Sequence, residues 1–221
     1  LLAESIGIKP NVSINLTKNL PVSSGIGGGS IDAAATLQVL CKFWNYSPPE
    51  ELLFQIAEKL GADVPACLFG RASFVSGIGN ELRPAPTLPK CWLVLVNPGI
   101  PVSTRQIFVN HSGNFSKSAP FEQPLNNLSE LVALLVDRSN DLTNAAIIEA
   151  PIIRNILSTF GQYPGTLLAR LSGSGATCFG LFENETDAKT TAVSLAEKNP
   201  QWWVCAAPML NKWGKIQIKI E

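Results

Sequence analysis

Histidine is nearly missing from this sequence, which has only His111 among its 221 residues. Metal centres and catalytic triads that use imidazole need further partners beside one histidine, so a lone histidine argues against both kinds of site. A surplus of either charge is missing too, because 17 basic and 17 acidic residues give a formal net charge of +0. We therefore expect neither nucleic acid nor an anionic membrane to be the main partner.

Long apolar runs and closely spaced cysteines are also absent. No apolar run approaches the roughly 18 residues that a membrane-spanning helix needs, so the sequence predicts no membrane span. The five cysteines show no zinc or redox spacing and their number is odd, which predicts reduced, buried thiols in a cytoplasmic protein. With 46% hydrophobic and 15% charged residues, the chain has the composition of a globular protein with one large or two small domains.

The most informative segment is the glycine cluster Gly25-Ile-Gly-Gly-Gly29. Apolar residues alternate with polar ones at 12–16, which predicts a half-buried strand before it. Apolar residues recur at helical spacing from about 30 to 44, which predicts a helix after it. The first N–H groups of a helix lack intrahelical acceptors, and glycines let a phosphate come close to them. The segment therefore predicts an anion site, although it matches neither Walker A nor G-x-G-x-x-G, and a flexible surface loop is the alternative.

The rest of the first half predicts a second helix and a short strand. A capping box at Ser47-Pro48-Pro49-Glu50 should start the helix, and Gly61 should end it. The strand is predicted at 72–76, with glycines turning the chain after it. A proline-rich stretch at 84–90 is the best boundary candidate, so we expect domains at 1–86 and 87–221.

The second half predicts a regular alternation of elements. A buried strand is expected at 91–96, a polar loop at 109–127, helices at 128–137, 141–149 and 151–160, strands at 167–171 and 177–182, a helix near 186–198 and a strand near 202–207. The order of strand, helices, two strands, helix and strand is that of a split βαβ, ferredoxin-like unit.

Three motifs in this order resemble those of the GHMP kinase superfamily. Pro21-Val-Ser-Ser-Gly-Ile-Gly-Gly-Gly-Ser-Ile-Asp-Ala-Ala34 resembles its phosphate-binding motif, P-x3-G-[LI]-G-x-[GS]-S-x-x-A-A. Leu60-Gly-Ala-Asp-Val-Pro65 looks like its catalytic-aspartate segment, and Leu171-Ser-Gly-Ser-Gly-Ala-Thr-Cys178 looks like its C-terminal glycine-rich motif. The resemblance implies an α+β, two-domain, ATP-dependent small-molecule kinase, with an N-terminal nucleotide-binding α/β domain truncated at its start and a C-terminal ferredoxin-like domain.

The triple glycine and Asn97-Pro-Gly99 narrow the resemblance to one branch of the superfamily. Its members use ATP and Mg²⁺ to phosphorylate the 2-hydroxyl of a cytidine-diphosphate-linked methylerythritol, in the non-mevalonate route to isoprenoid and terpenoid precursors. The resemblance therefore implies ATP and Mg²⁺ as cofactors and this small molecule as substrate, with no direct metal ligand assigned in the chain.

The resemblance also implies roles for single residues. Asp63 would be the catalytic base or the carboxylate that orients the attacking hydroxyl; from the sequence pattern alone, a helix cap is the simpler interpretation. Phe108 would pack against the cytosine with Thr104 nearby, although a lone phenylalanine more often belongs to a core. Gly173, Ser174 and Gly175 would border the substrate. The nucleotide would be held by Lys18, Pro21, Val22, Ser23, Ser24, Gly25, Ile26, Gly27, Gly28, Gly29, Ser30 and Ile31.

Some family residues have no counterpart in this sequence. The resemblance implies a catalytic lysine and an asparagine on a strand before residue 1, so we expect an N-terminally incomplete kinase. The alternatives are another GHMP kinase, of the homoserine or mevalonate type, and a nucleotide-binding fragment without turnover. We expect no nucleic-acid or membrane partner, and a monomer or weak homodimer.

Overall fold

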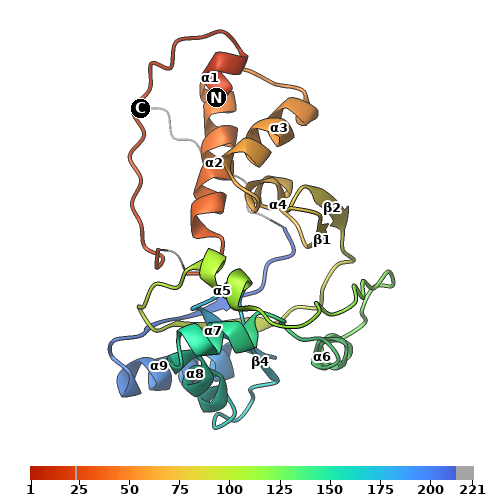
Figure 1. Ribbon diagram of the computed structural model, residues 1–221, viewed down its shortest axis with the longest axis vertical. Coiled ribbons are helices and arrows are strands. Elements are labelled where there is room, and N and C mark those ends of the chain that lie inside the picture. Colours follow the sequence, from red (N-terminus) through yellow and green to blue (C-terminus); the bar gives the residue numbers. More distant parts are fainter. Residues whose placement is uncertain (23, 213–221) are drawn as a thin grey trace. The chain divides into compact units, whose positions relative to one another are not determined.

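The computed structural model describes residues 1–22 and 24–212, which divide into two units (Figure 1). The first unit comprises Leu1–Leu20, Gly27–Ala85 and Lys212, and the second comprises Pro21–Ile26 and Pro86–Asn211. The polypeptide therefore changes unit at 20/21, 26/27, 85/86 and 211/212; the second change falls within the first glycine loop and the third within the proline-rich stretch. None of the helices in the described ranges has the length and apolar character needed to cross a lipid bilayer.

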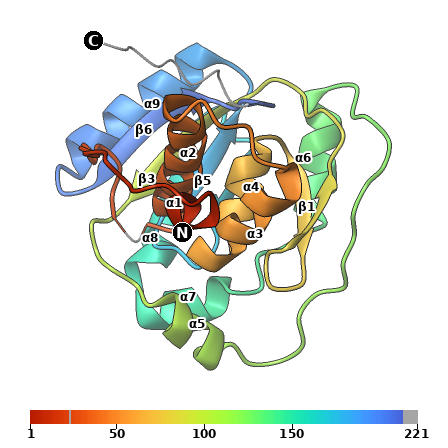
Figure 2. The same cartoon turned by 90° about the horizontal axis from the view of Figure 1, so that it is seen from above.

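The first unit is mainly helical. Its elements are α1 (Leu2–Ser5), α2 (Gly28–Phe43), α3 (Glu50–Leu60), α4 (Val64–Phe69), β1 (Ser73–Ser76) and β2 (Glu81–Pro84). α3 and α4 pack beside α2 (Figure 2). Leu37 of α2, Ile56 of α3 and Val64 of α4 share one buried apolar cluster. This cluster anchors the start of α4, and with it Asp63, against α2.

Both helices predicted for this unit and the short strand with its glycine turn are confirmed, but the segment before the glycine loop is not a strand. Residues 12–16 pair with no other strand in the described part of the chain, and Ile14 and Leu16 are exposed. The alternation of apolar side chains defines a face, but a strand also needs a neighbouring backbone that shares its hydrogen bonds. The prediction of a half-buried strand was therefore wrong.

The prediction of a capping box at the start of α3 was also wrong. The helix starts after Pro49, whose ψ of 141° is extended, and no side chain caps it. A residue that precedes proline is driven out of the helical region, so Pro48 cannot be the first helical residue. Ser47 consequently lies too far from the helix to cap it.

The second unit is a four-stranded antiparallel sheet in the order β4-β5-β3-β6. The strands are β3 (Trp92–Asn97), β4 (Leu168–Leu171), β5 (Cys178–Phe182) and β6 (Trp203–Pro208). The first strand of the unit, β3, pairs with the third and the fourth, which is the ferredoxin-like arrangement. The predicted split βαβ order is therefore confirmed.

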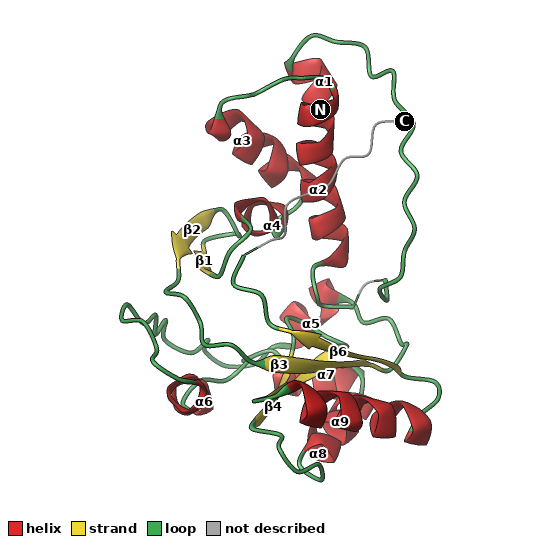
Figure 3. Cartoon of the chain, turned by 180° about the vertical axis from the view of Figure 1, so that it is seen from behind, coloured by secondary structure: helices red, strands yellow, loops and turns green. Residues whose placement is uncertain are grey.

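α8 (Ile152–Phe160) and α9 (Glu185–Lys198) cover one face of this sheet (Figure 3). The other helices described in this unit are α5 (Thr104–Asn110), α6 (Leu128–Val136) and α7 (Thr143–Glu149). Phe160 of α8 and Leu195 of α9 are buried with Val94 and Phe182 of the sheet in one core. The sequence missed α5, whose start is capped by Ser103, because seven residues are too few for a clear periodicity.

The cysteines are free, as predicted, but not all of them are buried. Cys41, Cys91 and Cys178 are buried, whereas Cys67 and Cys205 are partly exposed. Burial in the sheet core raises the pKa of the Cys178 thiol to about 12.

Candidate active site

The first glycine loop leads directly into the N-terminus of α2. Gly27 precedes the helix in the left-handed region, at a φ of 69°. A Cβ added at Gly27 or Gly29 would meet no atom within 4 Å, and one at Gly28 would meet only a Leu20 methyl at 3.9 Å. The start of α2 therefore combines N–H groups without helical acceptors, a positive dipole end and open space, which together suit a phosphate.

Ser30 is not at the start of α2, where a helix beginning near residue 30 would put it. Because α2 begins at Gly28, Ser30 lies inside the first turn, and no side chain caps the helix. The Ser30 hydroxyl is therefore not the N-cap group of α2. Ile31 follows on α2 with its side chain exposed.

Lys18 and Asp32 form an ion pair beside the first turns of α2. A carboxylate at this end of the helix would repel a phosphate, and the Lys18 ammonium offsets that repulsion. The Lys18 side chain is 38% exposed and that of Asp32 is 30% exposed. The ammonium thus remains accessible to an anionic ligand.

Asp63 stands at the N-cap position of α4, but its side chain makes no cap hydrogen bond. The residue is exposed. Its negative charge acts on Cys67 of the same helix, whose pKa is raised mainly by burial and further by Asp63. The capping interpretation finds no support here, and the carboxylate is available for a substrate.

The second glycine loop joins β4 to β5 and is closed by the Ser172 N–H, which donates to the Thr177 carbonyl at 2.9 Å. The hydroxyls of Thr104 and Ser174 lie 2.8 Å apart. The buried amide of Asn97 donates to the Thr177 hydroxyl at 2.9 Å. Two of the residues predicted to lie near the substrate, Thr104 and Ser174, are thus brought together by one hydrogen bond.

The two glycine loops are in direct contact within the second unit. The Ser172 hydroxyl donates to the Gly25 carbonyl at 2.8 Å, and the Thr177 N–H donates to the Ser24 carbonyl at 3.1 Å. A Cβ at Gly25 would lie 2.5 Å from the Gly175 carbonyl oxygen and 2.7 Å from that of Ser172. Gly25 is therefore a packing glycine, unlike Gly27 and its open surroundings.

Phe108 is not a core residue, since its side chain on α5 is 53% exposed. The ring of Phe115, exposed by 58%, lies 6.5 Å from it between centroids. His111 stacks on Phe115 at a centroid distance of 4.2 Å. The three rings form an aromatic group in which Phe108 and Phe115 are exposed and His111 is partly buried, and only Phe108 was predicted to contact a substrate.

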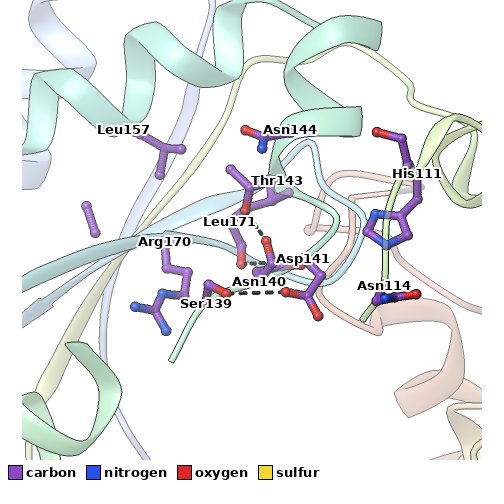
Figure 4. A pocket seen from close by; sticks show the side chains of 12 residues that line it. His111, Asn114, Ser139, Asn140, Asp141, Thr143, Asn144, Leu157, Arg170 and Leu171 are labelled. Carbon is purple, nitrogen blue, oxygen red and sulfur yellow. Dashed lines mark hydrogen bonds between the residues drawn. The ribbon is translucent and has the colours of Figure 1, made fainter. Parts of the chain in front are cut away.

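A cavity of about 460 Å³ opens beside this group (Figure 4). It is lined by His111, Ser112, Asn114, Ser139, Asn140, Asp141, Thr143, Asn144, Leu157, Ala169, Arg170 and Leu171. Arg170 donates to the Leu135 carbonyl of α6 at 2.9 Å, and burial lowers its pKa. Asn140 and Asp141 are also bonded to neighbouring segments, whereas the buried Nε2 of His111 has no hydrogen-bond partner among the residues that the structure describes.

The predicted nucleotide residues divide between the two units. Gly27 to Ile31 and Lys18 belong to the first unit, and Pro21 to Ile26 to the second. Val22 is 73% exposed, and Ser23 lies outside the described residues. Asn140, Asp141 and Phe115 were not predicted, because a short polar triplet between helices and one aromatic in a polar loop are typical of any connection.

The sequence matches known proteins along nearly its whole length. Residues 1–71 match the family model described as GHMP kinases N terminal domain, and residues 121–201 match the one described as GHMP kinases C terminal. The 4-diphosphocytidyl-2-C-methyl-D-erythritol kinase of Paramagnetospirillum magneticum is 45% identical over 211 residues, which are 96% of this chain and 74% of that protein. The chain belongs to the GHMP kinase family.

Other members of the GHMP kinase family agree with this assignment. The kinase of the same name from Rhodospirillum rubrum is 44% identical over 215 residues, 97% of this chain and 71% of that one. A crystal structure of 4-(cytidine 5'-diphospho)-2C-methyl-D-erythritol kinase has a TM-score of 0.66 at 29% identity and covers 86% of this chain and 68% of its own. A homoserine kinase from Cytophaga hutchinsonii has a TM-score of 0.71 at 17% identity, covering 96% and 73%, and shows the shared fold alone.

Membership confirms the resemblance that the three motifs indicated. The chain has the mixed helix and sheet fold of GHMP kinases and belongs to a family of enzymes that transfer phosphate to small molecules.

Proposed function

We propose that this chain phosphorylates the 2-hydroxyl of 4-diphosphocytidyl-2-C-methyl-D-erythritol with ATP, in the non-mevalonate route to isoprenoid precursors. The observation that carries the proposal is the 45% identity to a kinase of that name over 96% of the chain. The open start of α2, the exposed carboxylate of Asp63 and the exposed ring of Phe108 supply the groups that this reaction needs. We further propose two domains, 1–86 and 87–221, in a cytoplasmic monomer or weak homodimer.

The phosphates of ATP would bind at the start of α2. The N–H groups of Gly28, Gly29 and Ser30 are first-turn donors without helical acceptors. Lys18 adds the cation that anionic phosphates require, and its pairing with Asp32 holds it near this helix end. Within the second unit, the carbonyls of Ser24 and Gly25 accept hydrogen bonds from Thr177 and Ser172.

Asp63 would accept the proton of the attacking hydroxyl or hold that hydroxyl in line with the γ-phosphate. Phosphoryl transfer depends mainly on positioning and on neutralising charge, so one well-placed carboxylate is enough for this role. The buried contact of Val64 with the α2 core fixes the helix that begins next to Asp63. A rigid helix start restricts the movement of the carboxylate.

Mg²⁺ would be held mainly by the phosphates. In residues 1–22 and 24–212, no three His, Cys, Asp or Glu side chains come together in a group that could hold a metal. Mg²⁺ commonly binds through substrate phosphates, water and only one or two protein groups, and the Ser30 hydroxyl in the first turn of α2 would supply one such contact. The ion would neutralise charge on the phosphate oxygens.

The cytosine would stack on Phe108. Stacking a base on an aromatic side chain contributes about 1–3 kcal/mol. Because every base can stack in this way, nearby polar groups would have to distinguish cytosine from other bases. Thr104, at the start of the same helix, and Ser174, Gly173 and Gly175 of the second loop would contact the remainder of the substrate.

A three-substrate assay tests the proposal. The chain, and a form extended at its N-terminus because the relatives are longer, are given ATP, Mg²⁺ and the cytidine substrate, homoserine or mevalonate, and ADP release is followed. We expect turnover only with the cytidine compound, with competitive inhibition by CMP. Turnover of homoserine or mevalonate would favour the other kinase types, and no ADP release from either form with any alcohol would contradict the proposal.

Phe108→Ala supplies the residue-level test, with Val109→Ala as its matched control. Both side chains are exposed on α5, by 53% and 68%. Removing the ring should raise KM for the cytidine substrate by about tenfold, within the range expected for one stacking contact, and should leave KM for ATP unchanged. The control should change neither value.

A further inference from the structure

The turn between α6 and α7 carries two adjacent residues that hold different loops. The Asn140 amide donates to the Leu171 carbonyl at 3.1 Å and to the Gly173 carbonyl at 2.7 Å. Its oxygen accepts from the Leu142 N–H at 3.0 Å. Both amide hydrogens are therefore used on the second glycine loop and the strand before it, and the third bond fixes the orientation of the side chain.

Asp141 faces a different segment. Its carboxylate accepts from the Ser116 N–H at 2.7 Å and from the Ser116 hydroxyl at 2.5 Å. These charge-assisted hydrogen bonds lower the pKa of the carboxyl group. Ser116 follows Phe115 in the chain, so Asp141 holds the residue next to one member of the aromatic group.

We propose that Asn140 and Asp141 are positioning residues with separate targets. Asn140 acts on the first glycine loop, which receives the ATP phosphates, and Asp141 acts on the aromatic group, which receives the nucleobase. The proposal rests on the proposed function for the identity of the two ligands. It rests on the observed hydrogen bonds for the two targets.

The contacts of Asn140 extend to the first glycine loop through Gly173 and Ser172. Gly173, whose carbonyl Asn140 binds, lies against Gly25, because a Cβ at Gly173 would be 3.3 Å from the Gly25 carbonyl oxygen. Ser172, between the two carbonyls that Asn140 holds, donates to that same oxygen. Loss of the amide would leave two carbonyls without this donor and would loosen the support of Ser24 and Gly25 in the first glycine loop.

The contacts of Asp141 act on Phe115 through the neighbouring Ser116. Residues 112–120 are exposed, so few packing contacts restrain them. The two bonds to Ser116 are therefore a main restraint on Phe115, which stacks with His111 and neighbours Phe108. Without Asp141 the loop would lose this anchor, and the ring beside Phe108 would lose its fixed place.

Binding measurements separate the two positioning roles without requiring turnover. The Kd of a non-hydrolysable ATP analogue and the Kd of CMP are measured by calorimetry for the unaltered chain, Asn140→Ala, Asp141→Ala and Asp141→Asn. Asn140→Ala should raise the Kd of the ATP analogue about tenfold and leave that of CMP unchanged, and Asp141→Ala should do the reverse, consistent with the loss of one or two hydrogen bonds. Asp141→Asn, which keeps one acceptor oxygen, should fall between Asp141→Ala and the unaltered chain.

Asp137→Asn is the matched control. Asp137 ends α6 in the same connection and is exposed, and neither glycine loop nor the Ser116 segment hydrogen-bonds to it. This variant should leave both dissociation constants unchanged. A merely structural role would lower the unfolding midpoint and weaken both ligands together, so equal changes in the two constants would overturn the proposal.

The proposed function and the positioning proposal fail differently. If the unaltered chain binds both ligands with the expected split between variants but consumes no ATP with the cytidine substrate, the proposed reaction is wrong and the positioning roles stand. If the unaltered chain binds neither ligand, or the variants show no split, the positioning proposal is wrong.

Discussion

The hydroxyl of Ser172 donates a hydrogen bond of 2.8 Å to the carbonyl oxygen of Gly25, across a sequence separation of 147 residues. This contact makes the first glycine-rich motif depend on the second. Gly25 takes a φ of 75° and leaves no room for a Cβ, whereas Gly27 and Gly29 face open space. The glycines of one motif therefore serve two different purposes, packing at Gly25 and ligand access at the start of α2.

Gly25→Ala and Gly29→Ala should consequently have opposite effects on the free energy of unfolding. Gly25→Ala places a methyl group against the second loop at a positive φ, and should lower the free energy of unfolding by about 2–4 kcal/mol. Gly29→Ala lies in helical backbone with open space, and should raise it by about 0.5–1 kcal/mol while weakening ATP binding. Chemical denaturation and titration with an ATP analogue measure the two effects.

Gly61→Ala provides a control outside both glycine motifs. It follows α3 in extended backbone, and its added Cβ would meet only a Val64 methyl at 3.5 Å. This variant should leave ATP binding intact. Tight ATP binding by Gly29→Ala would contradict the assignment of the open start of α2 to phosphate.

Most of the fold was accessible from the sequence because burial leaves a periodic trace. The apolar run 91–96 predicted β3, and the helical spacing after residue 151 predicted α8. Residues 12–16 show the limit of this argument, since apolar alternation is local whereas strand pairing requires a second segment. The strand predicted at 12–16 was wrong for this reason.

The site was accessible only in part. Glycine loops and the aspartate before Val64 can be found from motifs, because the required backbone geometry restricts the residues allowed there. Asn140 and Phe115 leave no such trace. Their roles arise from tertiary contacts, with Gly173 and with His111, which connect segments that are separate in the chain or lie in an irregular loop.

Asp63→Asn should separate catalysis from folding. The side chain makes no cap hydrogen bond and is exposed, so the free energy of unfolding should change by less than about 0.5 kcal/mol. Loss of a catalytic base or orienting carboxylate should lower kcat by about 100-fold or more, with little change in ATP binding. A large loss of ATP binding or of stability would instead make Asp63 a structural residue.

Cys67 gives an independent check on the same variant. The negative charge of Asp63 adds to burial in raising the Cys67 pKa, so Asp63→Asn should lower that pKa without abolishing the effect of burial. The rate of thiol alkylation as a function of pH measures the shift. A double variant with Cys67→Ala shows which part of the signal belongs to this thiol.

Stability should decline in acid through two partly exposed carboxylates. Hydrogen bonds from Asn126 hold the pKa of Glu130 below its ordinary value of 4.5, and those from Ser116 hold the pKa of Asp141 below 3.8. A folded-state pKa below the unfolded value contributes stability above that unfolded value, and the contribution is lost as the pH falls through the folded pKa. The loss should therefore appear below about pH 4.5 for Glu130 and below about pH 3.8 for Asp141.

Glu130→Gln and Asp141→Asn should each flatten the acid limb of a plot of denaturation midpoint against pH. Asp137→Asn is again the control, since Asp137 is an exposed carboxylate directly after α6 and lies in the same connection as Asp141. An unchanged acid limb in both carboxylate variants would show that the hydrogen bonds from Asn126 and Ser116 do not persist in solution.

Lys18 and Asp32 test whether the ion pair beside α2 serves the ligand or the fold. An exposed pair contributes about 0–1 kcal/mol to stability, so neither Lys18→Met nor Asp32→Asn should unfold the protein. Lys18→Met removes the cation and leaves Asp32 to repel phosphate, and should raise the Kd of an ATP analogue by about tenfold at low salt. Asp32→Asn removes the repulsion and should leave binding unchanged or tighter.

The double variant decides the direction of the effect. If Asp32 weakens binding once Lys18 is gone, Lys18→Met combined with Asp32→Asn should bind the ATP analogue more tightly than Lys18→Met alone. The difference should shrink at high salt, because the charges are partly exposed and are screened. A fall in stability in both single variants with unchanged Kd values would assign the pair to the fold, and Lys18 would then have no part in holding the nucleotide.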